Sequence, residues 1–331
     1  MQFDYFCVMQ TIKTYQETFL NFLSNKVQTS EPDNLYAPIH YILQLGGKRL
    51  RPVLTLLTTD IFGGNPESAL DAALAIEVFH NFTLIHDDIM DDAPLRRGEQ
   101  TVHEKWDLNT GILSGDAMLI MAYQFFEGYS KTEFKDVVQL FSQTALEVCE
   151  GQQYDIDFET RSDVTIEEYL KMIEFKTAVL VAAAMKMGAI IANASIADQE
   201  SIYQFGRHLG IAFQLQDDYL DAFGNPETFG KQVGGDILEN KKTYLYLKAI
   251  EKATESQKEE LLKLFSLDDS TDDKVSKVKA LFVATRADVE IKKAIETYTL
   301  KAFSILDGLN VATSKKQILK EFGENLMNRK V

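Results

Sequence analysis

The chain has 331 residues and a mass of 37.5 kDa, and its 34 Lys and Arg against 50 Asp and Glu give a formal net charge of −16 and a pI near 4.8. This acidic balance excludes a general nucleic-acid-binding protein, because such a protein needs a basic face that neutralises phosphates. With 45% hydrophobic and 25% charged residues, the composition is that of a globular protein that can bury a large core.

The cysteines and the N-terminal residues both indicate a cytoplasmic protein. Cys7 and Cys149 show neither a disulfide framework nor metal-ligand spacing, which indicates a reducing compartment. The N-terminus lacks the basic segment and cleavage site of a signal peptide, and no run of 18 apolar residues follows, so we expect no stable membrane insertion. Because the helical pattern begins near Thr11, residues 1–10 are expected to be disordered or a non-native start, with Met1 or Met9 as the true first residue.

Long helical patterns predict an all-α fold. The segments 68–92, 164–193 and 199–221 have the pattern of long helices, several of them apolar nearly all round, which is typical of the middle of a large bundle. Asn65-Pro66-Glu67 offers a helix cap, a proline at the first helical position and an acid in the first turn. Period-two alternation is hard to find and no linker divides the chain, so we expect one helical domain over 1–331. We expect the acidic region 266–274 to be an exposed loop.

Two distant segments, 84–92 and 214–221, both contain the pattern DDxxD. On a helix, residues i and i+4 share a face with Cβ atoms ~5–6 Å apart, so Asp87 points with Asp91, and Asp217 with Asp221. Each cluster ends an apolar helix, where negative charge opposes the helix dipole at roughly 0.3–1 kcal/mol per charge. Repulsion between the carboxylates adds to this cost. Each cluster therefore requires a compensating cation.

The all-oxygen donor set of these clusters suits Mg²⁺ or Mn²⁺. Mg²⁺ usually binds one or two carboxylates together with phosphate oxygens of a substrate, so we expect a metal-bound diphosphate as the ligand. An EF-hand would need DxDxDG in a loop, and an HD-type phosphohydrolase would need more histidines than this chain has around His86. A solvated acidic helix end is the simpler alternative, but the apolar flanks and the repetition disfavour it.

Positive charge is concentrated at three places beside these clusters. The segment GGKRLRP at 46–52 places three cations on a glycine turn that leads into a helix N-terminus, where free backbone N–H groups favour anions. Arg96-Arg97-Gly98 follows the first cluster, and the arginine fork suits bidentate phosphate contact. Lys231, Lys241 and Lys242 follow the second cluster. One such turn alone would be a solvated surface feature, but this placement indicates diphosphate binding.

Six motifs in order make the chain resemble the trans-polyprenyl diphosphate synthases, which make geranyl, farnesyl, geranylgeranyl and longer diphosphates. They are GGKRLRP, DDIMDDAPLRRG, GQQYD at 151–155, Lys176-Thr177, FQLQDDYLD at 213–221 and GKQVGGDILENKKT at 230–243. The resemblance implies an isoprenoid-synthase-like helical bundle around a deep central cavity, with a motif-bearing core at about 36–245. It also implies a homodimer and two aspartate motifs that face each other across the cavity mouth. Gly235 departs from a common pattern, because some members carry a basic residue there.

The same resemblance implies roles for individual residues in a head-to-tail condensation that proceeds by ionisation, condensation and elimination. Three Mg²⁺ would be held on the allylic diphosphate by the aspartates of both motifs, Asp87, Asp88, Asp91, Asp217, Asp218 and Asp221. That diphosphate would also contact Arg96, Lys176, Lys231 and Lys241, whereas Lys48, Arg51, His80 and Arg97 would bind isopentenyl diphosphate. Thr177 and Gln214 would lie near the reacting carbons and favour the carbocation.

Product length is expected to depend on the residues that precede the first motif. Phe82 and Thr83 lie five and four residues before Asp87, roughly 6–7.5 Å deeper along the helix. The resemblance implies that short-chain enzymes carry an aromatic residue at the Phe82 position, and that farnesyl enzymes add a second at the Thr83 position or two residues within the motif. This sequence has neither farnesyl feature, so geranylgeranyl diphosphate is favoured over farnesyl diphosphate. In the alternative, Phe82 is ordinary core packing and the cavity floor lies elsewhere, for example at Met118 or Met121.

Two other functions share parts of this pattern. A class I terpene cyclase would have the first motif and the fold, but it typically has an Asn/Ser/Glu second motif and has no use for GGKRLRP. A non-catalytic subunit of a heteromeric synthase usually lacks aspartates that are all present here. Both are kept as alternatives to a Mg²⁺-dependent prenyltransferase.

Overall fold

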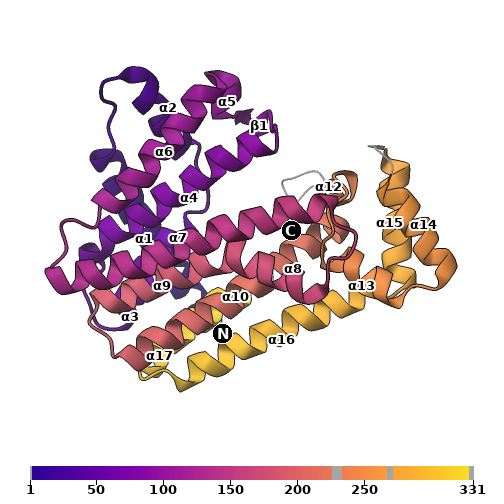
Figure 1. The fold of residues 1–331 in the computed structure, drawn as a ribbon. Helices are drawn as coiled ribbons and strands as arrows, with labels where there is room; N and C mark the ends of the chain where they lie inside the picture. Colours follow the sequence, from indigo (N-terminus) through magenta and orange to yellow (C-terminus); the bar gives the residue numbers. More distant parts are fainter. Residues whose placement is uncertain (1, 226–232, 267–270, 328–331) are drawn as a thin grey trace. The chain divides into compact units, whose positions relative to one another are not determined.

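A computed structural model describes residues 2–225, 233–266 and 271–327, with side chains from residue 12 onward. Within these ranges the regular structure is helical apart from two two-residue strands, β1 (Leu95–Arg96) and β2 (Glu99–Gln100), so the predicted all-α class is confirmed (Figure 1). The chain divides into two compact units, residues 1–142 with 183–200 and residues 143–182 with 201–331. The single domain expected over 1–331 stays a prediction.

The first unit is organised around α4 (Leu70–Met90), which follows a short 3₁₀ turn, η1 (Pro66–Ala69). The Asn65 side chain accepts a hydrogen bond from the Glu67 N–H at 3.1 Å, which confirms the predicted cap. Helix α4 packs against α3 (Leu50–Ile61) and α6 (Leu108–Gln124), while α1 (Gln2–Lys26) packs against α3 and α2 (Asp33–Gln44) packs against α6. The short α5 (Val102–Lys105) and the first part of α7 (Lys131–Thr160) also belong to this unit.

Helix α4 is buried on nearly all sides, as its apolar sequence predicts. Leu74, Ile76 and Val78 are fully buried although they lie on different faces of the helix. The stretch Pro66–Met90 is long and apolar enough to cross a membrane by length and composition, but 67% of its most apolar window is buried inside the protein. This is the environment of a core helix, and it places a motif at the end of a rigid element.

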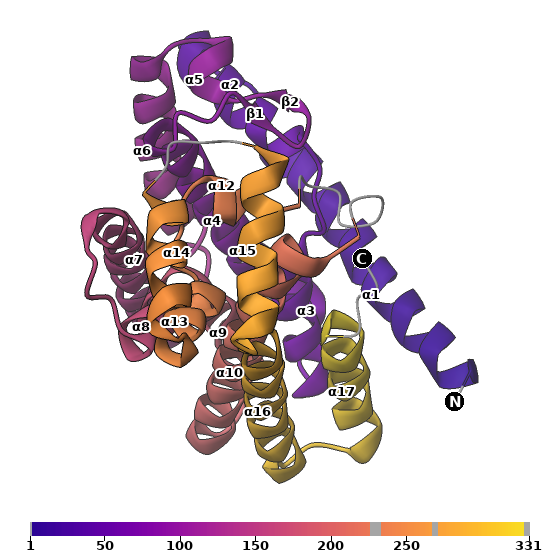
Figure 2. The ribbon, with the colours of Figure 1, turned by 90° about the vertical axis from the view of Figure 1, so that its right-hand side faces the viewer.

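The second unit contains residues 201–223 of α10 (Ile196–Phe223), which carry the second aspartate motif. It also contains an interruption of regular α-helix just before α9 (Val179–Ile191). Helix α8 (Ile166–Ile173) leads into a π-helical turn, η2 (Glu174–Ala178), and α12 (Gly235–Leu238) follows α10. Figure 2 shows the remaining helices of this unit, in which α13 packs on α16, and α15 packs on α14 and α16. They are α13 (Tyr244–Lys252), α14 (Glu255–Phe265), α15 (Asp272–Ala284), α16 (Ala287–Gly308) and α17 (Thr313–Met327).

Two local predictions were wrong, and one short hairpin was not predicted. Helix α1 begins at Gln2 rather than near Thr11, and residues 2–10 contain neither glycine nor proline to prevent it. Strands β1 and β2 form a hairpin too short to show any alternation. Of the expected acidic loop, residues 267–270 lie outside the described residues, but Asp272 already begins α15 and Lys274 is 1% exposed. The Thr271 side chain caps this helix by accepting from the Lys274 N–H.

Candidate active site

The first aspartate motif lies at the C-terminal end of α4, as predicted. Asp87 is half-buried within the last turn, and Asp91 is the exposed C-cap, whose N–H donates to the Asp87 carbonyl at 2.8 Å. These two side chains therefore occur one helical turn apart where the helix dipole repels negative charge. The arrangement retains the electrostatic cost inferred from the sequence, which a bound cation would relieve.

Asp88, between them, has a different environment. Its side chain is 1% exposed, and both of its oxygens accept from Arg96, at 2.8 Å from Nε and 2.6 Å from Nη2. A buried carboxylate needs such charge-assisted donors, because burial without them is strongly unfavourable. Asp88 therefore fixes Arg96, and with it the hairpin, against α4.

The hairpin that carries Arg96 also positions Arg97. Arg97 and Gly98 both have positive φ, 57° and 83°, as a two-residue hairpin turn with a tight right-handed twist requires. The Arg97 guanidinium donates to the carbonyl of Gly46. Gly47 has φ of 117°, and a Cβ at this position would come within 2.9 Å of the guanidinium. The GGKR and RRG motifs are thus held together by direct contact.

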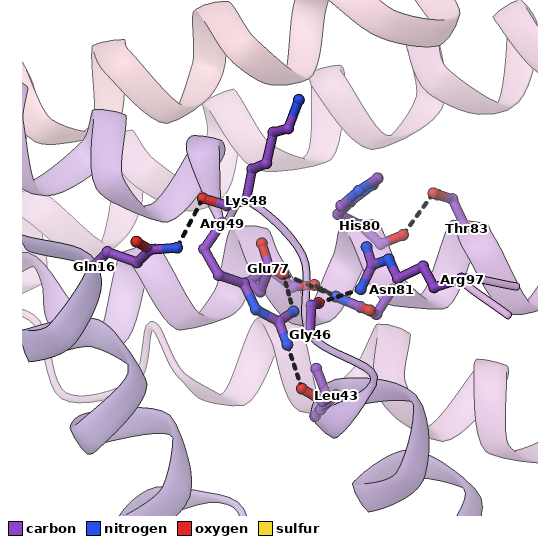
Figure 3. A network of polar contacts seen from close by, with 10 residues as sticks. All are labelled: Gln16, Leu43, Gly46, Lys48, Arg49, Glu77, His80, Asn81, Thr83 and Arg97. Carbon is purple, nitrogen blue, oxygen red and sulfur yellow. Dashed lines mark hydrogen bonds and ion pairs between the residues drawn. The ribbon is translucent and has the colours of Figure 1, made fainter. Parts of the chain in front are cut away.

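A buried ion pair anchors the loop before α3 (Figure 3). Arg49 adopts a left-handed conformation, with φ of 49°, and donates to the Glu77 carboxylate and to the Leu43 carbonyl. The side chains of Arg49 and Glu77 are 2% and 3% exposed. Asn81 adds a hydrogen bond from its Nδ2 to Glu77 Oε1 at 3.1 Å. Because Arg49 is fixed inward, the neighbouring Lys48 side chain points to the other side of the loop (Figure 3).

The electrostatics of this loop suit an anion. Burial, reinforced by the charges of four arginines, lowers the pKa of His80 well below its usual value, so the ring is neutral near pH 7; the four are Arg51, Arg97, Arg96 and Arg49. The Nε of Arg51 is buried and has no hydrogen-bond partner among the described residues. Burial also lowers the pKa of Arg51, which Glu77 opposes. A diphosphate would supply both the missing acceptor and the missing negative charge.

The second aspartate motif lies near the C-terminal end of α10, where Asp217 and Asp221 are half-buried. Asp221 receives hydrogen bonds from the turn that follows: its Oδ2 accepts from the Asp236 N–H at 3.1 Å and its carbonyl accepts from the Gly234 N–H at 2.7 Å. The backbone of residues 234–236 is therefore hydrogen-bonded to the second aspartate motif. Lys231, predicted to contact diphosphate, lies outside the described residues.

Asp218 repeats the environment of Asp88. It is 4% exposed, with Oδ2 accepting from the Tyr169 hydroxyl and Oδ1 accepting from Gln214 Nε2 at 3.0 Å. Burial, with the charges of Asp236 and Asp217, raises the pKa of Asp218 well above its usual value, although the two hydrogen bonds act in the opposite direction. In both motifs the middle aspartate is thus held within the protein.

The GQQYD and Lys176-Thr177 motifs meet at the π-helical turn η2. Gly151 of α7 allows this approach, since a Cβ there would lie 2.3 Å from the Lys176 backbone nitrogen. One turn later, the Asp155 carboxylate accepts from Lys176 Nζ at 2.5 Å. Thr177 donates from its hydroxyl to Gln214 Oε1 at 3.1 Å. π-Helical turns are frequent at functional sites, because they redirect side chains within a helix.

A cavity of about 130 Å³ in the second unit gathers these groups. It is lined on its polar side by Asp155, Lys176, Thr177, Gln214, Asp218, Asp236 and Lys241, and on its apolar side by Phe158, Met172 and Ile173. Lys241 pairs with Glu239 at 2.6 Å; burial lowers its pKa, but the surrounding carboxylates outweigh burial and raise it, so this lysine is cationic. Lys242 instead donates to two carbonyls at the end of α7, those of Phe158 and Glu159.

Beside the first motif, sequence reasoning missed one acidic group. The ligand atoms of Asp92, His103 and Glu104 lie within 4.8 Å of one another, which is a spacing that could hold a divalent cation. No spacing rule links Asp92 to His103, because the hairpin brings them together. Tyr169 was also missed, since it belongs to none of the six motifs.

Phe82, predicted to limit product length, is part of an aromatic cluster in the first unit. It is 8% exposed, with its ring centroid 5.5 Å from Phe79 and 4.8 Å from His86. Phe79 in turn packs on Phe141 at 5.1 Å. Thr83 has no such packing role, and its hydroxyl donates to the His80 carbonyl at 2.8 Å. Phe82 is therefore fixed in place by its neighbours.

Comparisons with known proteins agree with this reading of the motifs. A family model described as polyprenyl synthetase matches residues 32–283. A geranylgeranyl diphosphate synthase of Methanosarcina mazei is 46% identical over 228 residues, which cover 67% of this chain and 69% of that protein. A geranylfarnesyl diphosphate synthase of Natronomonas pharaonis is 40% identical over 260 residues, covering 73% and 76%. A crystal structure of a geranylgeranyl pyrophosphate synthase superposes with a TM-score of 0.93 at 55% identity, covering 97% and 99% of the two chains.

The Arg49–Glu77 pair gives a prediction for stability. Glu77→Ala should lower the free energy of unfolding by about 3–5 kcal/mol, because it leaves a buried guanidinium without its counterion. Denaturant unfolding followed by circular dichroism measures this change. Glu251→Ala removes the acid of a partly exposed pair with Lys248 and should leave the midpoint unchanged. Equal, small effects of both substitutions would show that the buried pair does not anchor the loop.

Proposed function

Because the chain belongs to the polyprenyl synthetase family and is a prenyltransferase, we propose that it condenses isopentenyl diphosphate with allylic diphosphates to form geranylgeranyl diphosphate. The C–O bond of the allylic diphosphate breaks, and the electron pair leaves with the diphosphate. The alkene of isopentenyl diphosphate then forms the new C–C bond, and a proton is lost. The observation that supports this proposal is that the chain carries two carboxylate motifs and a separate guanidinium-rich loop, since the reaction uses two diphosphates.

The allylic diphosphate is assigned to the aspartate motifs. Oxygen donors suit Mg²⁺, with Mn²⁺ as the alternative, and we assign up to three ions to the less buried carboxylates Asp87, Asp91, Asp217 and Asp221. Bound Mg²⁺ would neutralise the charge that develops on the departing diphosphate. The burial and the protein contacts of Asp88 and Asp218 favour positioning roles over the metal binding expected from the sequence. Arg96, Lys176, Lys231 and Lys241 are assigned to the same diphosphate, with Lys231 resting on the motif resemblance alone.

Isopentenyl diphosphate is assigned to the loop before α3. The unpartnered Nε of Arg51 and the neutral, arginine-surrounded His80 support this choice, together with Lys48 and Arg97. Fixed donors of this kind bind an anion without reorganising, because the Arg49–Glu77 pair already holds the loop. This diphosphate stays on the molecule through the reaction, so its site needs charge but no leaving-group activation.

The carbocation is assigned to the cavity beside η2. Thr177 and Gln214 present oxygen dipoles there, and Phe158, Met172 and Ile173 supply apolar walls that exclude water. The catalytic set is thus Asp87, Asp91, Asp217, Lys176, Thr177 and Gln214. Within the described residues no carboxylate is singled out as a base, so the released diphosphate is proposed to accept the proton.

The rival functions have less support. The comparisons give no support to a terpene cyclase or to a non-catalytic subunit, and both aspartate motifs are complete. The burial of the apolar α4 supports a core helix rather than a membrane span, and we propose a cytoplasmic protein that, on the family resemblance, forms a homodimer. The relatives are named for products of different length, so the product length proposed for this chain is argued from its own residues.

The purified chain, assayed alone with Mg²⁺, isopentenyl diphosphate and a five-, ten- or fifteen-carbon allylic diphosphate, tests this function. We expect a twenty-carbon diphosphate from each primer, sized by chromatography after dephosphorylation. Release of diphosphate from the allylic substrate with cyclic hydrocarbon as the product would instead identify a cyclase. Absence of any product without a second protein would identify a non-catalytic subunit.

Phe82 gives the prediction for product length. Phe82→Ala should shift products beyond twenty carbons, because it removes the aromatic ring that Phe79 and His86 hold in place. The size distribution of the products measures the shift. Met118→Ala is the matched comparison, since Met118 is fully buried on the neighbouring helix α6. An unchanged distribution in Phe82→Ala with longer products from Met118→Ala would place the floor on α6.

A further inference from the structure

Tyr169 is a buried residue of α8 that belongs to none of the six motifs. It is 3% exposed, and its hydroxyl donates to Oδ2 of Asp218, 49 residues further along the chain. It also lines the cavity that contains Thr177 and Gln214. A tyrosine hydroxyl in such a place is either a core group that has found a partner or part of the site, so its neighbours decide between the two.

The hydrogen bonds continue from Tyr169 to the proposed carbocation groups. Asp218 accepts on its other oxygen from Gln214 Nε2 at 3.0 Å. Gln214 Oε1 then accepts from the Thr177 hydroxyl at 3.1 Å. The four side chains come from α8, α10 and η2, and they form one continuous chain of hydrogen bonds in which Tyr169 and Gln214 both donate to Asp218.

We propose that Tyr169 is a positioning residue of the prenyl-transfer site, which holds Asp218 so that Asp218 fixes the Gln214 amide with its oxygen towards Thr177 and the cavity. This assignment rests on the proposed function for its catalytic meaning. The orientation matters because the two ends of an amide carry opposite partial charges. An amide rotated by 180° would direct its N–H groups towards the carbocation and disfavour it.

The role of Tyr169 follows from the burial of Asp218. With 4% of its surface exposed, Asp218 has little water to satisfy its oxygens, so each oxygen depends on a protein donor. Without the tyrosine hydroxyl, Asp218 Oδ2 loses its donor. The Asp218 side chain then reorients and no longer holds the Gln214 amide in the same position relative to Thr177. The effect therefore reaches the reacting carbons through Asp218, to which the Tyr169 hydroxyl donates, and then through Gln214.

The test compares Tyr169→Phe with Tyr246→Phe. Tyr246 is a matched control, because it is 7% exposed, lies in the core of the same unit, packs its ring against Phe265 and is not one of the residues that line the cavity. We expect Tyr169→Phe to lower kcat about 10- to 100-fold, with KM for both diphosphates changed less than about threefold, as for lost hydrogen bonds that act on the transition state. Tyr246→Phe should leave both constants unchanged.

Two further measurements separate positioning from a merely structural role. In the Gln214→Leu background, Tyr169→Phe should cause no additional loss of kcat, because residues acting through one group are not additive. In protein with ¹⁵N-labelled glutamine side chains, the Gln214 amide signal, assigned by its loss in Gln214→Leu, should move in Tyr169→Phe and stay in place in Tyr246→Phe. This signal requires no turnover.

The outcomes are distinguishable. An unmoved Gln214 signal, a fully additive loss of kcat in the double variant, or an unchanged kcat in Tyr169→Phe would each overturn the proposal. If the wild-type chain formed no prenyl product, the proposed function would fail, and the Gln214 signal alone would then decide whether Tyr169 orients the amide. Thermal unfolding of both variants completes the comparison, since a structural role would lower Tm without the non-additive loss of kcat.

Discussion

The hydrogen bonding of a buried aspartate side chain at the end of a helix is the interaction on which the candidate site depends. Both DDxxD motifs carry one aspartate that is almost inaccessible, and an isolated carboxylate in such a place is strongly unfavourable. Asp88 is satisfied by Arg96, whereas Asp218 is satisfied by Tyr169 and Gln214. In both motifs the buried aspartate therefore has protein hydrogen-bond donors, but the donors differ between the motifs.

The aspartates of each motif therefore have different roles. The middle aspartate orients protein groups, the hairpin arginine in one motif and the glutamine amide in the other. The flanking aspartates lie one helical turn apart, a spacing at which like charges repel and a divalent cation is favourable. A comparable division holds in the basic loop, where Arg49 is directed inward to Glu77 whereas the neighbouring Lys48 is exposed. An acidic protein can thus bind two polyanions.

Local rules predicted the helices and the clusters, but not the contacts made across long sequence distances. The apolar pattern of α4 and the Asn65 cap follow from neighbouring residues, and the i, i+4 spacing gives Asp87 with Asp91. The π-helical turn at Lys176 was not predicted, and neither was the close approach of Gly151 to it. The Arg97–Gly46 and Tyr169–Asp218 contacts join residues 51 and 49 positions apart. Lys274 was predicted to lie in a loop because its neighbours are acidic, whereas the Thr271 cap begins a helix there.

The division of roles within the motifs is tested most directly by metal binding. Mn²⁺ affinity in the presence of an unreactive allylic diphosphate analogue can be measured by calorimetry for Asp→Asn variants at 87, 88, 217 and 218. We predict that Asp87→Asn and Asp217→Asn weaken Mn²⁺ binding at least about tenfold more than Asp88→Asn and Asp218→Asn do, because direct ligands contribute more than residues that orient them. Equal losses at all four positions would contradict the account, since every aspartate would then bind metal directly.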